Sequence, residues 1–201
     1  MRNRIRTILA VSAFAILGMA ASAQPEAKKA KLEVGDRAPA FEAKDADGLT
    51  WKSTDHVGKK LIVVYFYPGD FTPGCIVQAK KFQENMNKLY DQGAEVVGVS
   101  GDSAKTHALF KDTYKLTYTL VADEKGDLAR MFGVPVGPGA NVKTTLPDKE
   151  RTKLEFKREV TAARWTFIIG LDGKIVYKNT KVDPLKDSQQ VEAFLKSFEK
   201  E

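Results

Sequence analysis

Residues 61–90 decide the fold, and they read LIVVYFYPGDFTPGCIVQAKKFQENMNKLY. The stretch opens with an apolar run, 61–67, rich in β-branched and aromatic types, which is typical of a strand buried on both faces. Pro68 and Gly69 end this strand. Apolar side chains then recur at spacings of three and four, which predicts one face of a helix: Cys75, Ala79, Phe82, Met86 and Leu89. A buried strand followed by an amphipathic helix favours an α/β protein.

The start of this helix places the sole cysteine of the chain among backbone N–H groups. Thr72 is a preferred N-cap and Pro73 suits the first helical position, so that Cys75 stands third in the helix. A thiolate there gains from the N–H groups of the first turn and from the positive end of the helix dipole. A cysteine in such a setting ionises more readily and is nucleophilic at neutral pH.

A lone cysteine can instead be a small buried side chain without chemistry. With one cysteine, the chain has no internal disulfide to stabilise it. A structural cysteine needs neither a capping threonine nor a Pro-Gly turn in front of it. The position of Cys75 therefore favours a nucleophile.

Three segments resemble the peroxiredoxins, and most of all their bacterioferritin-comigratory, PrxQ-like branch in the AhpC/TSA superfamily. Residues 67–75 are similar to the active-site pattern Pro-x-x-x-Thr-x-x-Cys, with Pro68, Thr72 and Cys75 at its fixed places. The other two segments resemble the opening of the family and its late arginine-bearing strand: VGDRAPAFEAKDADG, 34–48, and ARWTFIIGLDGKIVY, 163–177. The resemblance implies a thioredoxin-like fold, with a mixed, mainly parallel central sheet flanked by helices.

The resemblance also implies a thiol peroxidase that acts on hydrogen peroxide and organic hydroperoxides. Cys75 would attack a peroxide oxygen and become a sulfenic acid. The Thr72 hydroxyl and the backbone amides of Gly74 and Cys75 would hold the peroxide and stabilise the departing oxygen. Pro68 would shield the sulfur from water. This chemistry needs no cofactor and no metal.

An arginine stands immediately before the apolar strand predicted for residues 165–171. A strand-end arginine is usually a solvated charge. In peroxiredoxins, however, the arginine at this place reaches the cysteine sulfur, so the resemblance implies that Arg164 donates hydrogen bonds to Cys75. Arg158 is a second, weaker candidate for the same task.

The chain departs from many members of this branch, which carry a second, resolving cysteine five residues after the first. Here that position holds Lys80. The implied cycle is a one-cysteine mechanism of the thioredoxin-dependent type, completed by an external reductant, either a thioredoxin-like protein or a small thiol. Relatives in this branch imply a monomer or a weak homodimer.

The N-terminus has the pattern of a secretory signal. Residues 1–23 combine a basic start, an apolar run and a small-residue cleavage site, Ala-Ser-Ala. We expect cleavage, a disordered leader at 24–31, one domain at 32–201, and export, to the periplasm if the source is a Gram-negative bacterium. The apolar run is too short to favour a stable membrane span, and a retained N-terminal anchor is the alternative.

The composition excludes some classes of partner. The formal net charge is +6, with the basic residues spread along the chain. The sequence has no basic cluster interleaved with aromatic residues, the pattern that would predict a nucleic-acid surface. The two histidines, His56 and His107, stand apart among polar residues and are expected at the surface, not as metal ligands.

The rest of the chain alternates strands and helices, as an α/β fold requires. We predict strands at 94–100, 118–122, 165–171 and 174–177, and helices at 103–114, 127–132 and 188–199. An Asp-Gly turn, Asp172-Gly173, joins the last two strands as a hairpin. Residues 134–162, rich in Pro, Gly and charge, are predicted to form a long surface loop with a short strand near 154–160.

Other functions use the same cysteine. An exported redox sensor or regulatory protein would oxidise Cys75 as a signal, and slow recycling with a specific partner would identify it. A thioredoxin-like disulfide oxidoreductase normally needs Cys-x-x-Cys, which residues 74–78 do not provide. A structural or carrier protein would bury a cysteine that peroxide does not oxidise.

Overall fold

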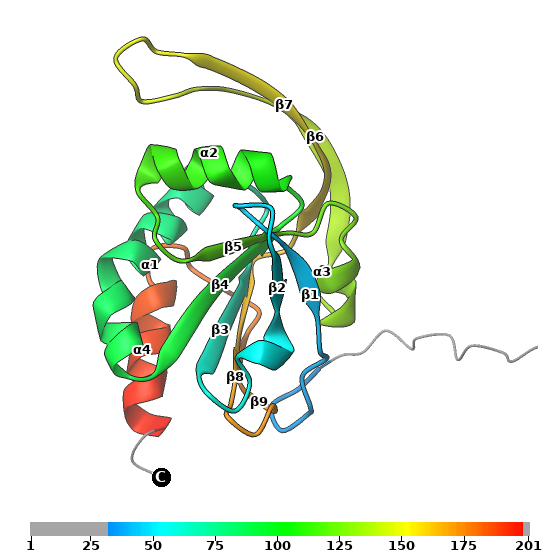
Figure 1. Cartoon of the computed structure of the whole chain (residues 1–201), viewed down its shortest axis with the longest axis vertical. Helices are drawn as coiled ribbons and strands as arrows, with labels where there is room; N and C mark the ends of the chain where they lie inside the picture. The colour runs from blue at the N-terminus through cyan, green and yellow to red at the C-terminus, as the bar shows by residue number, and fades with distance from the viewer. Residues whose placement is uncertain (1–31, 199–201) are drawn as a thin grey trace, which may run out of the picture.

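The computed structural model describes residues 32–198, so the predicted signal and leader, 1–23 and 24–31, lie outside the described residues. A seven-stranded sheet in the order β2-β1-β5-β4-β3-β8-β9 forms the centre of the molecule (Figure 1). Its strands are β1 (Glu42–Asp45), β2 (Thr50–Lys52), β3 (Leu61–Phe66), β4 (Ala94–Ser100), β5 (Thr119–Ala122), β8 (Trp165–Ile169) and β9 (Ile175–Asn179).

The sheet is mixed, as predicted. Its central strands β3, β4 and β5 run parallel. Antiparallel partners flank them, with β8 and β9 on one side and β1 and β2 on the other. The antiparallel pairing of β3 with β8 matters for the site, because the end of β3 then lies beside the start of β8, where Phe66 faces Trp165.

Helices cover both faces of the sheet (Figure 1). They are α1 (Pro73–Asp91), α2 (Ala104–Tyr114), α3 (Asp127–Met131) and α4 (Asp187–Phe198), with a short 3-10 turn at Ser53–Asp55. In β3, Val63 and Tyr65 pack toward α1, α2 and α4, whereas Ile62 and Val64 pack toward α3. Every residue of β3 is buried, which confirms the prediction of a strand without a solvent face.

The predicted surface loop at 134–162 is wrong, but the short strand predicted near 154–160 is confirmed as part of a longer strand. Strands β6 (Val136–Thr145) and β7 (Lys153–Ala162) pair antiparallel in a separate two-stranded sheet. This hairpin, the β6–β7 arm (136–162), curves over α2 (Figure 1). Its inward side chains alternate along β7 as Leu154, Phe156 and Arg158. The charged member of that series breaks the apolar alternation by which a strand is recognised.

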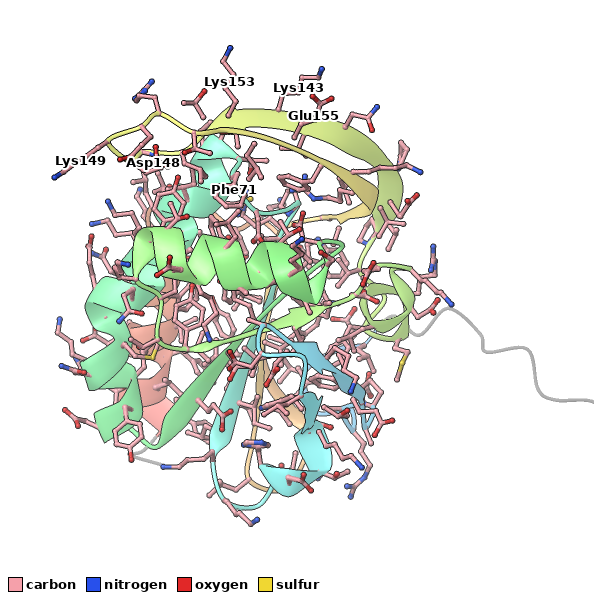
Figure 2. The ribbon with its side chains drawn as sticks, turned by 45° about the horizontal axis from the view of Figure 1, so that its top comes forward. Phe71, Lys143, Asp148, Lys149, Lys153 and Glu155 are labelled. Carbon is pink, nitrogen blue, oxygen red and sulfur yellow. The ribbon has the colours of Figure 1, made fainter. Side chains whose placement is uncertain are left out.

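The arm has an apolar and a charged side. Leu146, Leu154 and Phe156 pack against the core that contains Phe71. Figure 2 shows Phe71 beneath the arm, and charged side chains such as Lys143 and Glu155 on its outer side. The burial of its inner face explains why the arm folds back over the domain.

The hairpin of β1 and β2 was not predicted, because these strands are short and mostly polar. The hairpin of β8 and β9 is confirmed, with its turn at Gly173 in the left-handed region (φ +78°). The other predicted strands and helices appear close to their predicted bounds. Between residues 32 and 198, no helix is both long and apolar enough to cross a membrane.

Candidate active site

Cys75 lies in the first turn of α1, at the end of the loop that leaves β3, and its side chain is 1% exposed. Thr72 is the N-cap residue, and its carbonyl accepts the N–H groups of Cys75 at 3.0 Å and Ile76 at 2.9 Å. The Thr72 hydroxyl does not cap the helix but donates to the Gly69 carbonyl at 3.0 Å. The N–H of Cys75 therefore already has a partner within the helix.

Arg164 lies against the sulfur. Its Nη2 is 3.2 Å from the Sγ of Cys75. The antiparallel register of β3 and β8 explains the contact, because Arg164 immediately precedes β8 and so lies beside the chain that leaves β3. Gly74 lies beside this contact, since a Cβ there would meet Nη2 of Arg164 at 3.4 Å and Pro184 at 3.8 Å, both ordinary van der Waals distances.

Two residues that the sequence analysis missed hold Arg164 from the other side. Gln78 accepts a hydrogen bond from Nη1 of Arg164, and its own Nε2 donates to Oδ2 of Asp187 at 2.6 Å. Thr166 also donates to Oδ2 of Asp187, at 2.8 Å. Gln78 stands three residues after Cys75, a helical spacing that faces the same side. Asp187 has no comparable local signal.

Burial raises the pKa of Asp187 to about 6, against the opposing effects of its hydrogen bonds from Gln78 and Thr166 and of the charge of Arg164. The carboxyl group is fully buried at the start of α4. Gln78, which holds Arg164, is hydrogen-bonded to this carboxyl group. A change in the charge of Asp187 therefore acts directly on Gln78.

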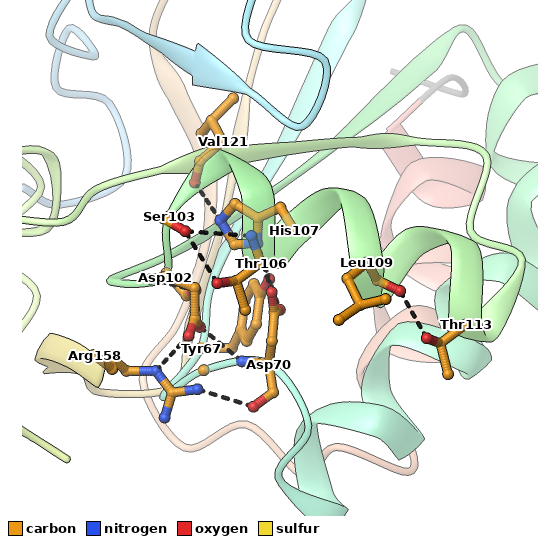
Figure 3. Close-up of polar contacts among 12 residues, drawn as sticks. Tyr67, Asp70, Asp102, Ser103, Thr106, His107, Leu109, Thr113, Val121 and Arg158 are labelled. Atoms are coloured by element: carbon orange, nitrogen blue, oxygen red, sulfur yellow. Dashed lines mark hydrogen bonds and ion pairs between the residues drawn. The ribbon is translucent and has the colours of Figure 1, made fainter. Parts of the chain in front are cut away.

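A second polar group, the buried polar cluster, holds the loop before Cys75 (Figure 3). Its members are Tyr67, Asp70, Asp102, His107 and Arg158. Asp70 receives hydrogen bonds on its carboxylate from Tyr67 at 2.8 Å and is 2.8 Å from Nδ1 of His107. Its backbone N–H donates to Asp102 at 2.7 Å. The loop is thus tied to α2 and to the end of β4.

Arg158 does not reach Cys75, so its candidate role at the sulfur is wrong. It comes from the β6–β7 arm, where Nε donates to Asp102 at 2.8 Å and Nη2 donates to the carbonyl of Asp70 at 2.8 Å. Its side chain is only 3% exposed. Arg158 therefore joins the arm to the loop that carries Gly69, whose missing Cβ would lie 1.9 Å from Cζ of Arg158.

The expected surface position of His107 is also wrong, because the ring is fully buried. Burial alone would lower the pKa of His107, but the charge and hydrogen bond of Asp70, with the charge of Asp102, raise it above the ordinary value. Burial and the charge of Asp70 raise the pKa of Asp102 against the opposing charge of Arg158. His56 is half-buried and contacts Glu95 at 2.6 Å.

Phe71 adds local strain to the loop. Its φ is +59°, a left-handed conformation that costs an L-residue with a side chain about 1–2 kcal/mol. Packing against Phe110, with ring centroids 5.1 Å apart, and against Phe156 at 6.0 Å holds the ring in place. Such strain is often found beside reactive groups.

Within residues 32–198, no group of three or more His, Cys, Asp or Glu side chains is arranged to hold a metal ion. Cys75, Gly74 and Arg164 are brought together, with Thr72 at the start of the same helix. Pro68 is half-buried in the loop. The catalytic roles assigned to these residues stay predictions.

An α/β sheet that places a buried cysteine at a helix start, against an arginine, defines a thiol-dependent enzyme of the thioredoxin-like class. Comparison with known proteins narrows the class. The model of the AhpC/TSA family matches residues 34–178. The chain is 36% identical over 171 residues to the chloroplastic peroxiredoxin Q of Suaeda salsa, covering 84% of this chain and 70% of that protein. A similar match, 36% over 170 residues, is found with peroxiredoxin Q of Gentiana triflora, covering 84% and 69%.

Solved structures agree. A mutant of Xanthomonas campestris peroxiredoxin Q matches with a TM-score of 0.66 and 26% identity, covering 85% of this chain and 99% of that one. PrxQ of Xylella fastidiosa, also a mutant, matches in fold with a TM-score of 0.69 at 24% identity, covering 85% and 99%. The chain belongs to the AhpC/TSA family, and with its peroxiredoxin Q relatives it is a thiol peroxidase, an oxidoreductase.

Proposed function

We propose that this peroxiredoxin reduces hydrogen peroxide and organic hydroperoxides through Cys75 in a one-cysteine cycle, with an external thiol as the reductant. The observation that carries the proposal is the 3.2 Å contact between Arg164 and the sulfur. A guanidinium at that distance can donate a hydrogen bond to the sulfur and to the negative charge that develops on the departing oxygen. A structural cysteine has no need of a half-buried guanidinium in contact with its sulfur.

In the first half of the cycle, the thiolate of Cys75 attacks the terminal oxygen of the hydroperoxide. The S–O bond forms, the O–O bond breaks, and its electron pair leaves with the alkoxide or hydroxide, which takes a proton from water. Arg164 and the N–H of Gly74 are the donors proposed for the departing oxygen, and the Thr72 hydroxyl for the bound peroxide. Pro68 limits the access of water.

In the second half, an external thiol attacks the sulfenic acid, and water leaves as a mixed disulfide forms. A second thiol then releases the Cys75 thiol and a disulfide of the reductant. The chain supplies no resolving thiol, because Cys75 is its only cysteine and Lys80 stands at the resolving position. A small thiol or a thioredoxin-like protein therefore has to reduce the sulfenic acid of Cys75.

Organic hydroperoxides are included for two reasons. The surroundings of the first turn of α1 include an apolar side chain, Pro184, near Gly74. A relative of 26% identity, the bacterioferritin comigratory protein of Xanthomonas campestris, was solved in a study of alkyl peroxide reduction. Both features support a hydroperoxide substrate that carries an alkyl group.

Whole-protein mass spectrometry of the reduced chain tests the proposal. One equivalent of hydrogen peroxide is added in the presence of a sulfenic-acid trap. We expect rapid trapping on Cys75 that is lost in Thr72→Val and Arg164→Ala variants, and turnover when a suitable thiol is added. A folded parent chain whose thiol is still unreacted after minutes would overturn the proposal. Rapid oxidation with slow recycling by every thiol tried would point to a redox sensor.

We further propose that the chain is exported and works as a monomer or weak homodimer. The basic start, apolar run and Ala-Ser-Ala sequence of residues 1–23 support export. The two relatives named above are chloroplastic proteins, and that location is a property of those relatives. Expression in a Gram-negative host should yield a periplasmic chain that begins at Gln24 by intact mass. A full-length chain confined to the cytosol would contradict export, and light scattering gives the assembly state.

A further inference from the structure

Arg164 is held between two partners. One terminal nitrogen, Nη2, is 3.2 Å from the sulfur of Cys75, and the other, Nη1, donates to Oε1 of Gln78. Gln78 is 1% exposed, so water does not compete for its amide. The position of the guanidinium against the sulfur therefore depends on the position of this amide.

The amide of Gln78 also has a fixed direction. A guanidinium can only donate hydrogen bonds, and an ionised carboxylate can only accept them. The amide lies between one of each, because its Nε2 donates to Oδ2 of Asp187 at 2.6 Å. Turned by half a rotation, it would point its NH₂ group at Arg164 and its oxygen at Asp187, and both hydrogen bonds would be lost.

Asp187 lies in an environment that is unfavourable for an ionised carboxylate. The carboxyl group is fully buried, and its Oδ1 is without a hydrogen-bond partner among the described residues. Only Oδ2 is satisfied, by Gln78 and by the Thr166 hydroxyl at 2.8 Å. A buried carboxylate with one unpaired oxygen destabilises a fold, so its presence calls for another reason.

We propose that Asp187 is a positioning residue for the peroxide reaction: it fixes the amide of Gln78 so that Gln78 holds Arg164 against the sulfur of Cys75. The proposal rests on the peroxidase function given above. It joins the start of α4 to the start of α1 across 109 residues of sequence. Two charged or titratable groups interact electrostatically with Asp187, and these are Arg164 and Tyr177.

The first test compares two substitutions of Asp187. The measured quantity is the rate constant for trapping of the Cys75 sulfenic acid in a single turnover with hydrogen peroxide. Asp187→Leu removes the acceptor at similar size, and we expect the rate constant to fall about tenfold or more. Asp187→Asn keeps an acceptor oxygen for Gln78, and we expect it to be at least about fivefold faster than the Leu variant.

The second test asks for rescue, which a purely structural role would not give. Gln78→Glu is added to Asp187→Leu. The new carboxylate accepts from Arg164 with either oxygen, so it needs no partner to set its direction. We expect the double variant to recover most of the lost rate. Asp187→Val replaces the Leu variant if that chain does not fold, with the same two expected results.

The matched control is Asp183→Leu, the same substitution in the segment before α4. Asp183 accepts from the N–H of Leu185 at 2.9 Å and pairs with Lys186, and it makes no hydrogen bond or ion pair with Gln78 or Arg164. We expect less than about a twofold change in rate constant. A folded Asp187→Leu variant that reacts like the parent, or a loss that Gln78→Glu does not recover, would overturn the proposal. A parent chain that does not react with peroxide would instead overturn the proposed function.

Discussion

The two terminal nitrogens of Arg164 have different partners, the sulfur of Cys75 and the amide of Gln78. The planar fork of a guanidinium can hold both in one geometry, whereas the single ammonium of lysine cannot. Arginine is therefore required at this position for a reason other than its charge.

We expect Arg164→Lys to slow the reaction of Cys75 with hydrogen peroxide by about 10- to 100-fold, although the positive charge is kept. Stopped-flow mixing with the sulfenic-acid trap measures the rate constant. Arg130→Lys is the control, because Arg130 is exposed at the end of α3 and contacts Lys125 and Asp127. Equal rates in the parent and Arg164→Lys chains would show that charge alone is needed.

Position 69 requires a glycine for two reasons, its positive φ angle and the lack of space for a Cβ. Its φ is +152°, and a Cβ would lie 1.9 Å from Cζ of Arg158. We expect Gly69→Ala to lower the free energy of unfolding by about 3 kcal/mol or more, since the buried arginine has to move away from Asp102. Urea unfolding measures it. Gly93→Ala is the control, because Gly93 has a positive φ, +72°, but nothing within 4 Å.

The control separates the clash from backbone strain. A left-handed conformation alone costs an alanine about 1–2 kcal/mol. If the free energy of unfolding falls by the same amount in both variants, the close approach of Arg158 to Gly69 does not contribute to stability.

The β6–β7 arm is the element that distinguishes this molecule from a bare sheet with helices, and Arg158 anchors it. The guanidinium lies between two groups of the loop region, the carboxylate of Asp102 and the carbonyl of Asp70. The arm therefore contributes a buried charge to the segment that precedes Cys75, whereas the hydrogen bond to the sulfur comes from Arg164, which lies outside the arm.

We expect Arg158→Met to destabilise the protein by about 3–5 kcal/mol, because it leaves the buried carboxylate of Asp102 without its cation. Amide exchange in the arm and in the loop at 68–72 should speed up together. Lys157→Met is the control on the same strand, since Lys157 is exposed and pairs only with Glu159 among the described ion pairs. A stable variant with faster exchange in the arm alone would show that the arm and the loop are independent.

For the whole molecule, buried groups with raised pKa values set the dependence of stability on pH. The pKa of Asp187 in the folded protein is about 6, and the ordinary value is 3.8. Between these values the folded state holds the proton and the unfolded state does not. The stabilisation is complete below about pH 4 and is lost as the pH rises through about 6.

We therefore expect the difference in free energy of unfolding, parent minus Asp187→Asn, to fall by about 2.5 kcal/mol between pH 4 and pH 7. Urea unfolding of both chains at the two pH values measures it. Asp183→Asn serves as the control for the loss of a carboxylate from the same segment. A difference that stays constant with pH would show that Asp187 does not titrate in this range.

Much of the fold could be read from local sequence. The apolar run of β3, the Thr-Pro start of α1 and the Asp-Gly turn after β8 are set by the spacing of residues within a few positions. These features also located Cys75, and the absence of a second cysteine predicted a one-cysteine cycle. The resemblance to peroxiredoxins supplied Arg164, whose place before β8 is confirmed as adjacent to the sulfur.

Apart from Gln78, which stands at a helical spacing from Cys75, the missed features have no local signal. The alternation of β7 is broken by a charged residue, Arg158, that is buried only because Asp102 lies 56 positions earlier in the chain. His107 is buried because Asp70, 37 positions away, offers its carboxylate. A polar residue can be recognised as buried only when its partner is known.

The sequence by itself determined the central strand, the place of the cysteine at a helix start and the lack of a resolving thiol, because each depends on neighbouring residues or on a residue count. The tertiary structure alone decided what surrounds Arg164. Gln78 and Asp187 meet because α1 and α4 pack on the same face of the sheet, and Arg164 joins them because β8 runs antiparallel to β3. Such contacts arise from packing between distant segments, which no local pattern encodes.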